Sequence, residues 1–129
     1  PVSVSDIRDH HMHQERVRMS QAAADAINRA KAKGSRILAV GSTCVRSLES
    51  AADASGRISG IDGWCDLFIY PGYRFKMVDA MITNFHLPKS TLLMLVSSFA
   101  GRDTIMKTYR EAIERGYRFY SYGDAMLII

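Results

Sequence analysis

Several features are scarce in this 129-residue sequence, and each absence argues against a class of protein. There are only two cysteines, Cys44 and Cys65, and no Cys-x-x-Cys pair, which argues against a disulfide-stabilised secreted domain and favours the reducing cytoplasm. The apolar runs are far shorter than the roughly 20 residues of a membrane-spanning helix, so we expect no membrane partner. The stretch GSTCVRS matches neither GxGxxG nor a P-loop, so it lacks the usual sequence motifs for binding dinucleotides and nucleoside triphosphates.

The residues that are present fit one globular domain. Hydrophobic residues make up 47% of the chain, which is enough to form a core. The net charge of +4 and the pI near 9.3 are compatible with an anionic partner such as nucleic acid. The sequence begins at Pro1 with neither an initiator Met nor a signal peptide, so we expect it to be part of a longer chain.

Hydrophobic patterning predicts a layered α/β domain. We expect residues 1–19 to be an extended segment leading in from the missing part of the chain, and residues 20–129 to be the α/β domain. Four helices are predicted: residues 21–33 capped by Ser20, 42–56 capped by Ser42 or Thr43, 91–100, and one running from a cap at Asp103 to Gly116. Strands are predicted at RILAVG (36–41), 64–70, 74–85 and in the tail after 117. The alternation favours a mixed, partly parallel sheet flanked by helices, with RILAVG as a buried parallel strand.

Two places in the sequence follow predicted strand ends, where open α/β sheets usually bind ligands. They are Gly41–Thr43 and Thr83–Ser90, and each has a cation beside it, Arg46 and Lys89. A cation near a helix N-terminus is unfavourable unless an anion lies nearby, so we predict phosphate or carboxylate binding at both places. Alternatively, Arg46 pairs with Glu49 or a more distant carboxylate, and Lys89 is solvated.

Histidines are the candidate acid-base groups. His86 follows a strand and precedes a proline, and its neutral imidazole would suit a general base near neutral pH, although a hydrogen-bonded structural histidine is an alternative. The stretch DHHMHQE carries His10, His11 and His13, which could bind a metal, contact substrate or lie on the surface. No second cluster with the spacing of metal ligands accompanies it, so we expect no metal.

Two carboxylates interrupt apolar stretches, Asp79 in MVDAMI and Asp124 in SYGDAMLII. A carboxylate that is buried there needs a partner. For Asp124, we expect that partner to be Arg74 or Lys76.

Four segments together resemble the S-adenosylmethionine:tRNA ribosyltransferase-isomerase family of queuosine biosynthesis. They are DHHMHQE, AVGSTCVRSLESAA, DLFIYPGYRFKMVDAMITNFHLPKSTLLMLVSSFAG and FYSYGDAMLI. The likeness covers nearly the whole chain, and the third segment is very specific. The resemblance implies the carboxyl-terminal part of a larger cytoplasmic enzyme, expected to be monomeric, whose α/β domain is interrupted by a β-barrel.

The resemblance also implies a reaction on the anticodon region of tRNA. The ribosyl portion of S-adenosylmethionine, a co-substrate, would be transferred to an aminomethyl-deazaguanine at the wobble position and isomerised to epoxyqueuosine, with release of adenine and methionine. Two other hypotheses remain: a noncatalytic tRNA-binding module or inactive fragment of that enzyme, and a metal-dependent hydrolase built on DHHMHQE.

Roles for individual residues follow from the implied chemistry. We expect His86, His10 or His13 to be the base that removes a hydrogen next to the sulfonium. Substrate contacts are expected from two groups, Ser42, Thr43 and Arg46 in one, and Thr83, Asn84, Lys89, Ser90 and Thr91 in the other. The group that contains Lys89 would hold the methionine carboxylate or a tRNA phosphate, and the group that contains Arg46 would hold the other of these two anions. The side chains expected to position tRNA phosphates are Arg74, Lys76 and Arg102.

The sequence departs from the family pattern at two positions of GSTCVRS. Ser42 and Cys44 stand where threonine or serine is more usual. The loss of a hydroxyl at Cys44 weakens the expectation of a ligand contact there.

Overall fold

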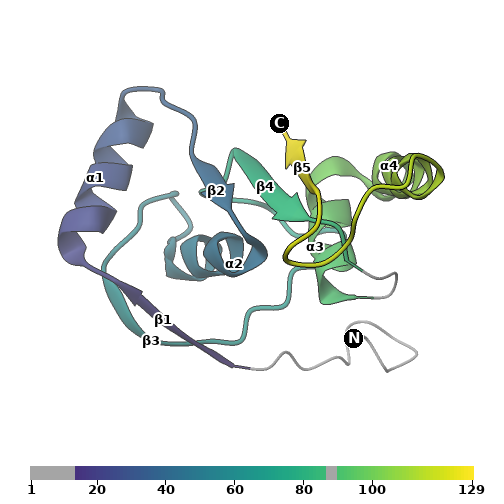
Figure 1. Cartoon of the computed structure of the whole chain (residues 1–129). Helices are drawn as coiled ribbons and strands as arrows, with labels where there is room; N and C mark the ends of the chain where they lie inside the picture. Colours follow the sequence, from purple (N-terminus) through teal and green to yellow (C-terminus); the bar gives the residue numbers. More distant parts are fainter. Residues whose placement is uncertain (1–13, 87–89) are drawn as a thin grey trace.

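The computed structural model describes residues 14–86 and 90–129, which fold into a mixture of strands and helices (Figure 1). The strands are β1 (Glu15–Met19), β2 (Leu38–Val40), β3 (Ile61–Cys65), β4 (Ala80–Asn84) and β5 (Ala125–Ile128). The helices are α1 (Gln21–Ala32), α2 (Ser42–Ala51), α3 (Thr91–Ala100) and α4 (Arg102–Glu114). None of the helices in these two ranges is long and apolar enough to span a bilayer.

A mixed three-stranded sheet with the order β2-β4-β5 organises the fold. Strand β2 runs parallel to β4, with Val40 opposite Ile82, and β5 returns antiparallel, with Leu127 opposite Ile82. Parallel strands end at the same edge of a sheet, and here α2 follows β2 and α3 follows β4 from that edge (Figure 1). The predicted α/β class with a mixed, helix-flanked sheet is therefore confirmed.

A second, two-stranded sheet pairs β1 with β3 in antiparallel register, with Glu15 opposite Cys65 and Met19 opposite Ile61. Residues 15–19 are thus extended, as expected. The strand predicted over residues 64–70 is confirmed only at Trp64 and Cys65, because β3 begins at Ile61 and ends at Cys65, where its pairing with β1 ends.

The strand predicted over residues 74–85 is too long, since β4 begins only at Ala80. The backbone N–H groups of Lys76, Met77 and Val78 donate to the carboxylate of Glu49 instead of to a neighbouring strand. A buried side chain has therefore taken the hydrogen bonds that a β-ladder would use.

Local caps set the starts of α1 and α3 as predicted. The hydroxyl of Ser20 accepts from the Ala23 amide at 3.0 Å, and that of Ser90 accepts from the Leu93 amide at 3.2 Å. The caps predicted for the other two helices are wrong, because α2 and α4 begin after Gly41 and Gly101, with φ of 94° and 93°. Glycine adopts positive φ at little cost, which allows the chain to turn abruptly into each helix.

The core lies on one face of the β2-β4-β5 sheet, where Ala39 and Met81 pack against helices α2, α3 and α4. The opposite face carries Val40, Ile82 and Leu127 side by side in register, and Val40 and Leu127 are exposed. Strand β2 is parallel as predicted, but the expectation that it is buried is wrong for this second face. The described helices cover only one side of the sheet.

Candidate functional site

Strand β4 delivers polar side chains to the edge of the sheet where α2 and α3 begin. A hydrogen bond of 2.8 Å from the Gly41 amide to the Ile82 carbonyl ties the start of α2 to this strand. Thr83 is buried and Asn84 is half-buried at the end of β4, and His86 follows two residues later. The parallel register thus brings Gly41–Thr43 and the described residues 83–86 to the same edge of the sheet.

His86 is half-buried, and its backbone is held in place by a neighbouring helix. Its amide donates to the hydroxyl of Tyr109 on α4 at 3.3 Å, and burial raises the pKa of that phenol, which therefore keeps its proton. The His86 ring lies against Tyr120, with 6.2 Å between the ring centroids. Within the described part of the chain, no hydrogen bond engages the imidazole nitrogens.

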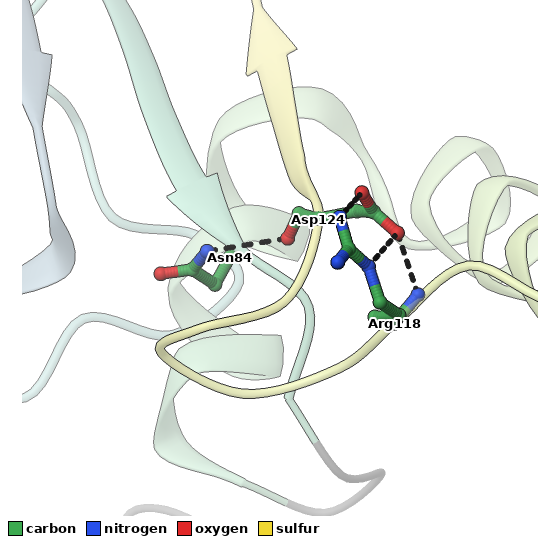
Figure 2. Close-up of polar contacts among 3 residues, drawn as sticks. All are labelled: Asn84, Arg118 and Asp124. Atoms are coloured by element: carbon green, nitrogen blue, oxygen red, sulfur yellow. Dashed lines mark hydrogen bonds and ion pairs between the residues drawn. The ribbon is translucent and has the colours of Figure 1, made fainter.

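An ion pair between Arg118 and Asp124 closes a loop over residues 118–124, which lies against the end of β4 (Figure 2). The Asp124 carboxylate accepts from the Arg118 amide at 2.7 Å and from its guanidinium at 3.1 Å. Asn84 then donates to the Asp124 carbonyl at 3.2 Å. The hydrogen bonds from Arg118 lower the pKa of Asp124, which keeps the carboxylate ionised. The expectation of Arg74 or Lys76 as its partner is wrong, because the partner is a near neighbour in sequence.

At the start of α3, the hydroxyl of Ser90, which was predicted to contact a ligand, instead bonds to the backbone of the helix. The Ser90 hydroxyl is the helix cap, and Thr91 is a half-buried residue in the first turn. Lys89, His10 and His13 were also expected at the site, but they lie outside the described residues. Among the described residues at this end, Asn84 and His86 are polar side chains that are not used to cap the helix.

The start of α2 is open by comparison. Gly41 provides no side-chain cap for the first amides of the helix. Ser42 is half-buried and Thr43 is exposed. Helix amides without a cap are suited to hydrogen bonding with an anion, and the ligand contact expected of these two residues stays a prediction.

Arg46, the cation beside that helix start, is only 6% exposed and forms an ion pair with Glu15 of β1. One guanidinium nitrogen, Nη1, is buried without a hydrogen-bond partner among the described residues. The sequence offered Glu49 or a more distant carboxylate as a partner of Arg46, and the structure shows the distant one, Glu15. The ion pair accounts for a cation in a position that the helix dipole disfavours.

Sequence reasoning missed Glu49, which is 0% exposed. Its carboxylate accepts from the amides of Lys76, Met77 and Val78 at 2.8 to 2.9 Å and from the Tyr73 hydroxyl at 3.0 Å. Burial and this neighbouring charge raise the pKa of Tyr73. The available signal for Glu49 was its position on the apolar face of a helix, one turn after Val45.

The second carboxylate in an apolar stretch also acts within the fold. Asp79 accepts from the amide of Ile37 at 2.8 Å, just before β2. Like Glu49, it holds the segments from which the parallel strands emerge.

The three predicted phosphate contacts lie in different environments. Arg74 and Arg102 are exposed, with Arg102 at the first position of α4. Lys76 is half-buried, and its ammonium group donates to the Ala52 carbonyl at 3.0 Å.

Among the described residues, no group of three or more His, Cys, Asp and Glu side chains is placed to hold a metal.

Comparison with known proteins assigns a family to this architecture. The family model described as "Queuosine biosynthesis protein" matches residues 1–128. S-adenosylmethionine:tRNA ribosyltransferase-isomerases of Moorella thermoacetica and Desulfitobacterium hafniense are 60% and 58% identical over the whole chain, which spans 38% of each relative. A crystal structure of S-adenosylmethionine tRNA ribosyltransferase from Thermotoga maritima matches with a TM-score of 0.81 at 51% identity, covering 87% of this chain and 39% of that one. This chain therefore belongs to the queuosine biosynthesis protein family.

Proposed function

We propose that the protein containing this chain is an S-adenosylmethionine:tRNA ribosyltransferase-isomerase, and that the chain supplies part of its active site. The observation that carries this proposal is the convergence of His86, Asn84 and the starts of α2 and α3 at one edge of the sheet. The printed names of the relatives supply the two substrates, S-adenosylmethionine and tRNA. The chain spans 38% of those relatives, so other parts of the active site lie beyond it.

The proposed reaction transfers the ribosyl portion of S-adenosylmethionine to the aminomethyl-deazaguanine wobble base of tRNA. Isomerisation of that unit gives epoxyqueuosine, and adenine and methionine leave. Because a sulfonium acidifies the adjacent 5′ hydrogens, the reaction needs a base close to them. His86 is the candidate that the geometry supports best, since its imidazole nitrogens have no partner among the described residues. His10 and His13 remain alternatives from the sequence.

The two helix starts are suited to the two anionic groups of the substrates. The uncapped amides at Ser42 and Thr43 can donate hydrogen bonds directly to a carboxylate or phosphate. At the other start, Thr83, Asn84, Thr91 and Lys89 form the second group, while the Ser90 hydroxyl orders the helix itself. In this proposal Arg46, in the first turns of α2, adds positive potential to this helix start, although it is paired with Glu15.

Exposed arginines provide the proposed tRNA contacts. Arg74 and Arg102 can reach phosphates without loss of any hydrogen bond within the chain that the structure describes. Lys76 would have to leave the Ala52 carbonyl, so we expect it to contribute less. We further propose that the full-length enzyme is a cytoplasmic monomer that requires no metal.

The decisive experiment measures adenine release by the full-length protein supplied with S-adenosylmethionine and tRNA bearing the aminomethyl-deazaguanine. Turnover should require both substrates and should fall by about 100-fold or more in His86→Ala, the range for loss of a general base. Lys89→Ala should also lose turnover, whereas Arg29→Ala, an exposed cation on α1, should keep it. Wild-type turnover in both His86→Ala and Lys89→Ala would overturn the assignment of the site.

Two alternative functions have their own signatures. A noncatalytic tRNA-binding module would bind tRNA but release no adenine under any condition. A metal-dependent hydrolase built on DHHMHQE would contain stoichiometric metal after purification, which elemental analysis would detect.

A further inference from the structure

Tyrosines are exposed along the segment that precedes β5. Tyr120 is 51% exposed and Tyr122 is 100% exposed. Phe119, between them and the core, packs against Phe85 with 5.4 Å between ring centroids. The segment therefore packs one half-buried aromatic ring against the core and presents two others to solvent.

The loop that carries these rings is fixed by its own backbone. The Tyr120 amide donates to the Phe85 carbonyl at 2.7 Å, and the Gly123 amide donates to the Tyr120 carbonyl at 2.9 Å. A Cβ atom at Gly123 would lie 2.5 Å from the carbonyl oxygens of Arg118 and Phe119, so the turn is closed tightly. Together with the Arg118–Asp124 ion pair, these contacts order the loop before any ligand arrives.

Tyr120 occupies an unfavourable backbone conformation. Its φ is 72°, and among the described residues it is the one residue other than glycine that has a positive φ. Such a conformation costs an aromatic residue free energy and persists where the surrounding contacts enforce it. Strain of this kind is concentrated at functional sites, where it directs a side chain that a relaxed backbone would point elsewhere.

The strained residue lies beside the candidate base. The Tyr120 ring is 6.2 Å from the His86 ring, with 66° between the two planes. The charge of Arg118, the nearest cation along the loop, is balanced by Asp124. The exposed face of the Tyr120 ring beside His86 is aromatic, which suits the flat face of another ring.

We propose that Tyr120 is a stacking platform for a nucleobase of the substrates. Stacking on an aromatic side chain needs only the flat face of a base, and about half of the Tyr120 side chain is open to receive it. The inference rests on the proposed function, whose substrates offer two such rings: the adenine of S-adenosylmethionine and a base of the tRNA anticodon loop. The shared chemistry is a purine-like ring placed next to His86.

The test compares variants of the full-length protein in two equilibrium binding assays, one with S-adenosylmethionine and one with tRNA at fixed salt. Tyr120→Asn removes the ring with a residue that tolerates positive φ, so the loop keeps its conformation. We expect it to weaken the binding of one substrate by roughly 5- to 150-fold, the range for loss of one base–aromatic stack. Weaker S-adenosylmethionine binding would identify adenine, and weaker tRNA binding a tRNA base.

Two matched variants keep the inference falsifiable. Tyr120→Phe keeps the ring and should bind both substrates like wild type. Tyr122→Asn removes a fully exposed ring from the same loop and should also bind like wild type. The inference is overturned if Tyr120→Asn binds both substrates normally, if Tyr120→Phe is as weak as Tyr120→Asn, or if Tyr122→Asn shows the same loss. A wild-type protein that bound neither substrate would overturn the proposed function as well.

Discussion

Helices α2 and α3 begin at the same edge of the β2-β4-β5 sheet, but they use their polar residues in different ways. Helix α2 starts without a side-chain cap, and its charged residues Arg46 and Glu49 are buried in contacts with distant parts of the chain. Helix α3 starts at the Ser90 cap and is largely apolar from Leu92 onward. Its neighbours Asn84 and His86 face the loop that carries Tyr120.

The difference separates scaffold from site. Around α2, charged side chains satisfy one another or the backbone, so their removal should first affect folding. Around the start of α3, the half-buried Asn84 and His86 and the exposed Tyr120 are ordered by local contacts, so their removal should first affect ligands. An Arg or Glu placed against local rules is thus no sufficient sign of a ligand site, because an internal partner can account for it.

The largest effect should follow removal of the Glu49 carboxylate. Glu49→Ala would leave the amides of Met77 and Val78 buried without acceptors, at a cost of about 3 kcal/mol or more. Native-state hydrogen exchange of those amides in the full-length protein measures the loss. Glu114→Ala, which removes an exposed carboxylate from α4, is the control and should leave exchange unchanged. Equal protection in both variants would mean that Glu49 is not part of the scaffold.

A smaller effect is expected at the ion pair beneath α2. Glu15→Ala would leave the buried guanidinium of Arg46 without its partner and should destabilise β1 by about 1 to 2 kcal/mol. Asp62→Ala breaks an exposed ion pair with Arg16 on the same two-stranded sheet and should cost at most about 1 kcal/mol. Exchange rates of the β1 amides compare the two variants. If Arg46 served an external anion alone, Glu15→Ala would leave these rates unaltered.

The cap of α3 should contribute less again. Ser90→Ala removes the acceptor for the Leu93 amide and should cost about 1 kcal/mol, seen as faster exchange in the first turn of the helix. Ser90→Asp keeps a capping oxygen and should restore protection. A Ser90→Asp variant as labile as Ser90→Ala would show that the hydroxyl has another role.

The smallest effect is a titration at the 118–124 loop. Hydrogen bonds from Arg118 lower the pKa of Asp124, so the ion pair is complete above the ordinary carboxyl pKa of about 4 and is lost as the pH falls through the lowered pKa of Asp124. A carbon NMR titration of the Asp124 carboxyl should show this low pKa. Arg118→Gln should return the pKa toward the ordinary value. An ordinary pKa in the unaltered protein would contradict the ion pair.

The sequence predicted the elements that local chemistry determines. Helices α1 and α3 begin at the expected serines, because a capping hydroxyl acts within three residues of itself. The polar end of β4 was also expected, since strand ends in α/β sheets gather ligand-binding groups.

The features that were missed depend on distant contacts. The late start of β4 is set by Glu49, which lies 27 residues before Lys76 along the chain. The end of β3 is set by its pairing with β1, and the positive φ of Tyr120 by a hydrogen bond to Phe85. Single-sequence patterns contain no term for such partners, so the scaffold around α2 and the aromatic part of the site became visible only in the fold.

The most direct measurement is a structure of the full-length protein bound to S-adenosylmethionine. We predict that the ligand lies at the carboxyl edge of the β2-β4-β5 sheet, with its sulfonium side toward His86 and its charged end at a helix start. S-adenosylmethionine bound away from residues 83–86 and from the 118–124 loop would contradict the proposed site.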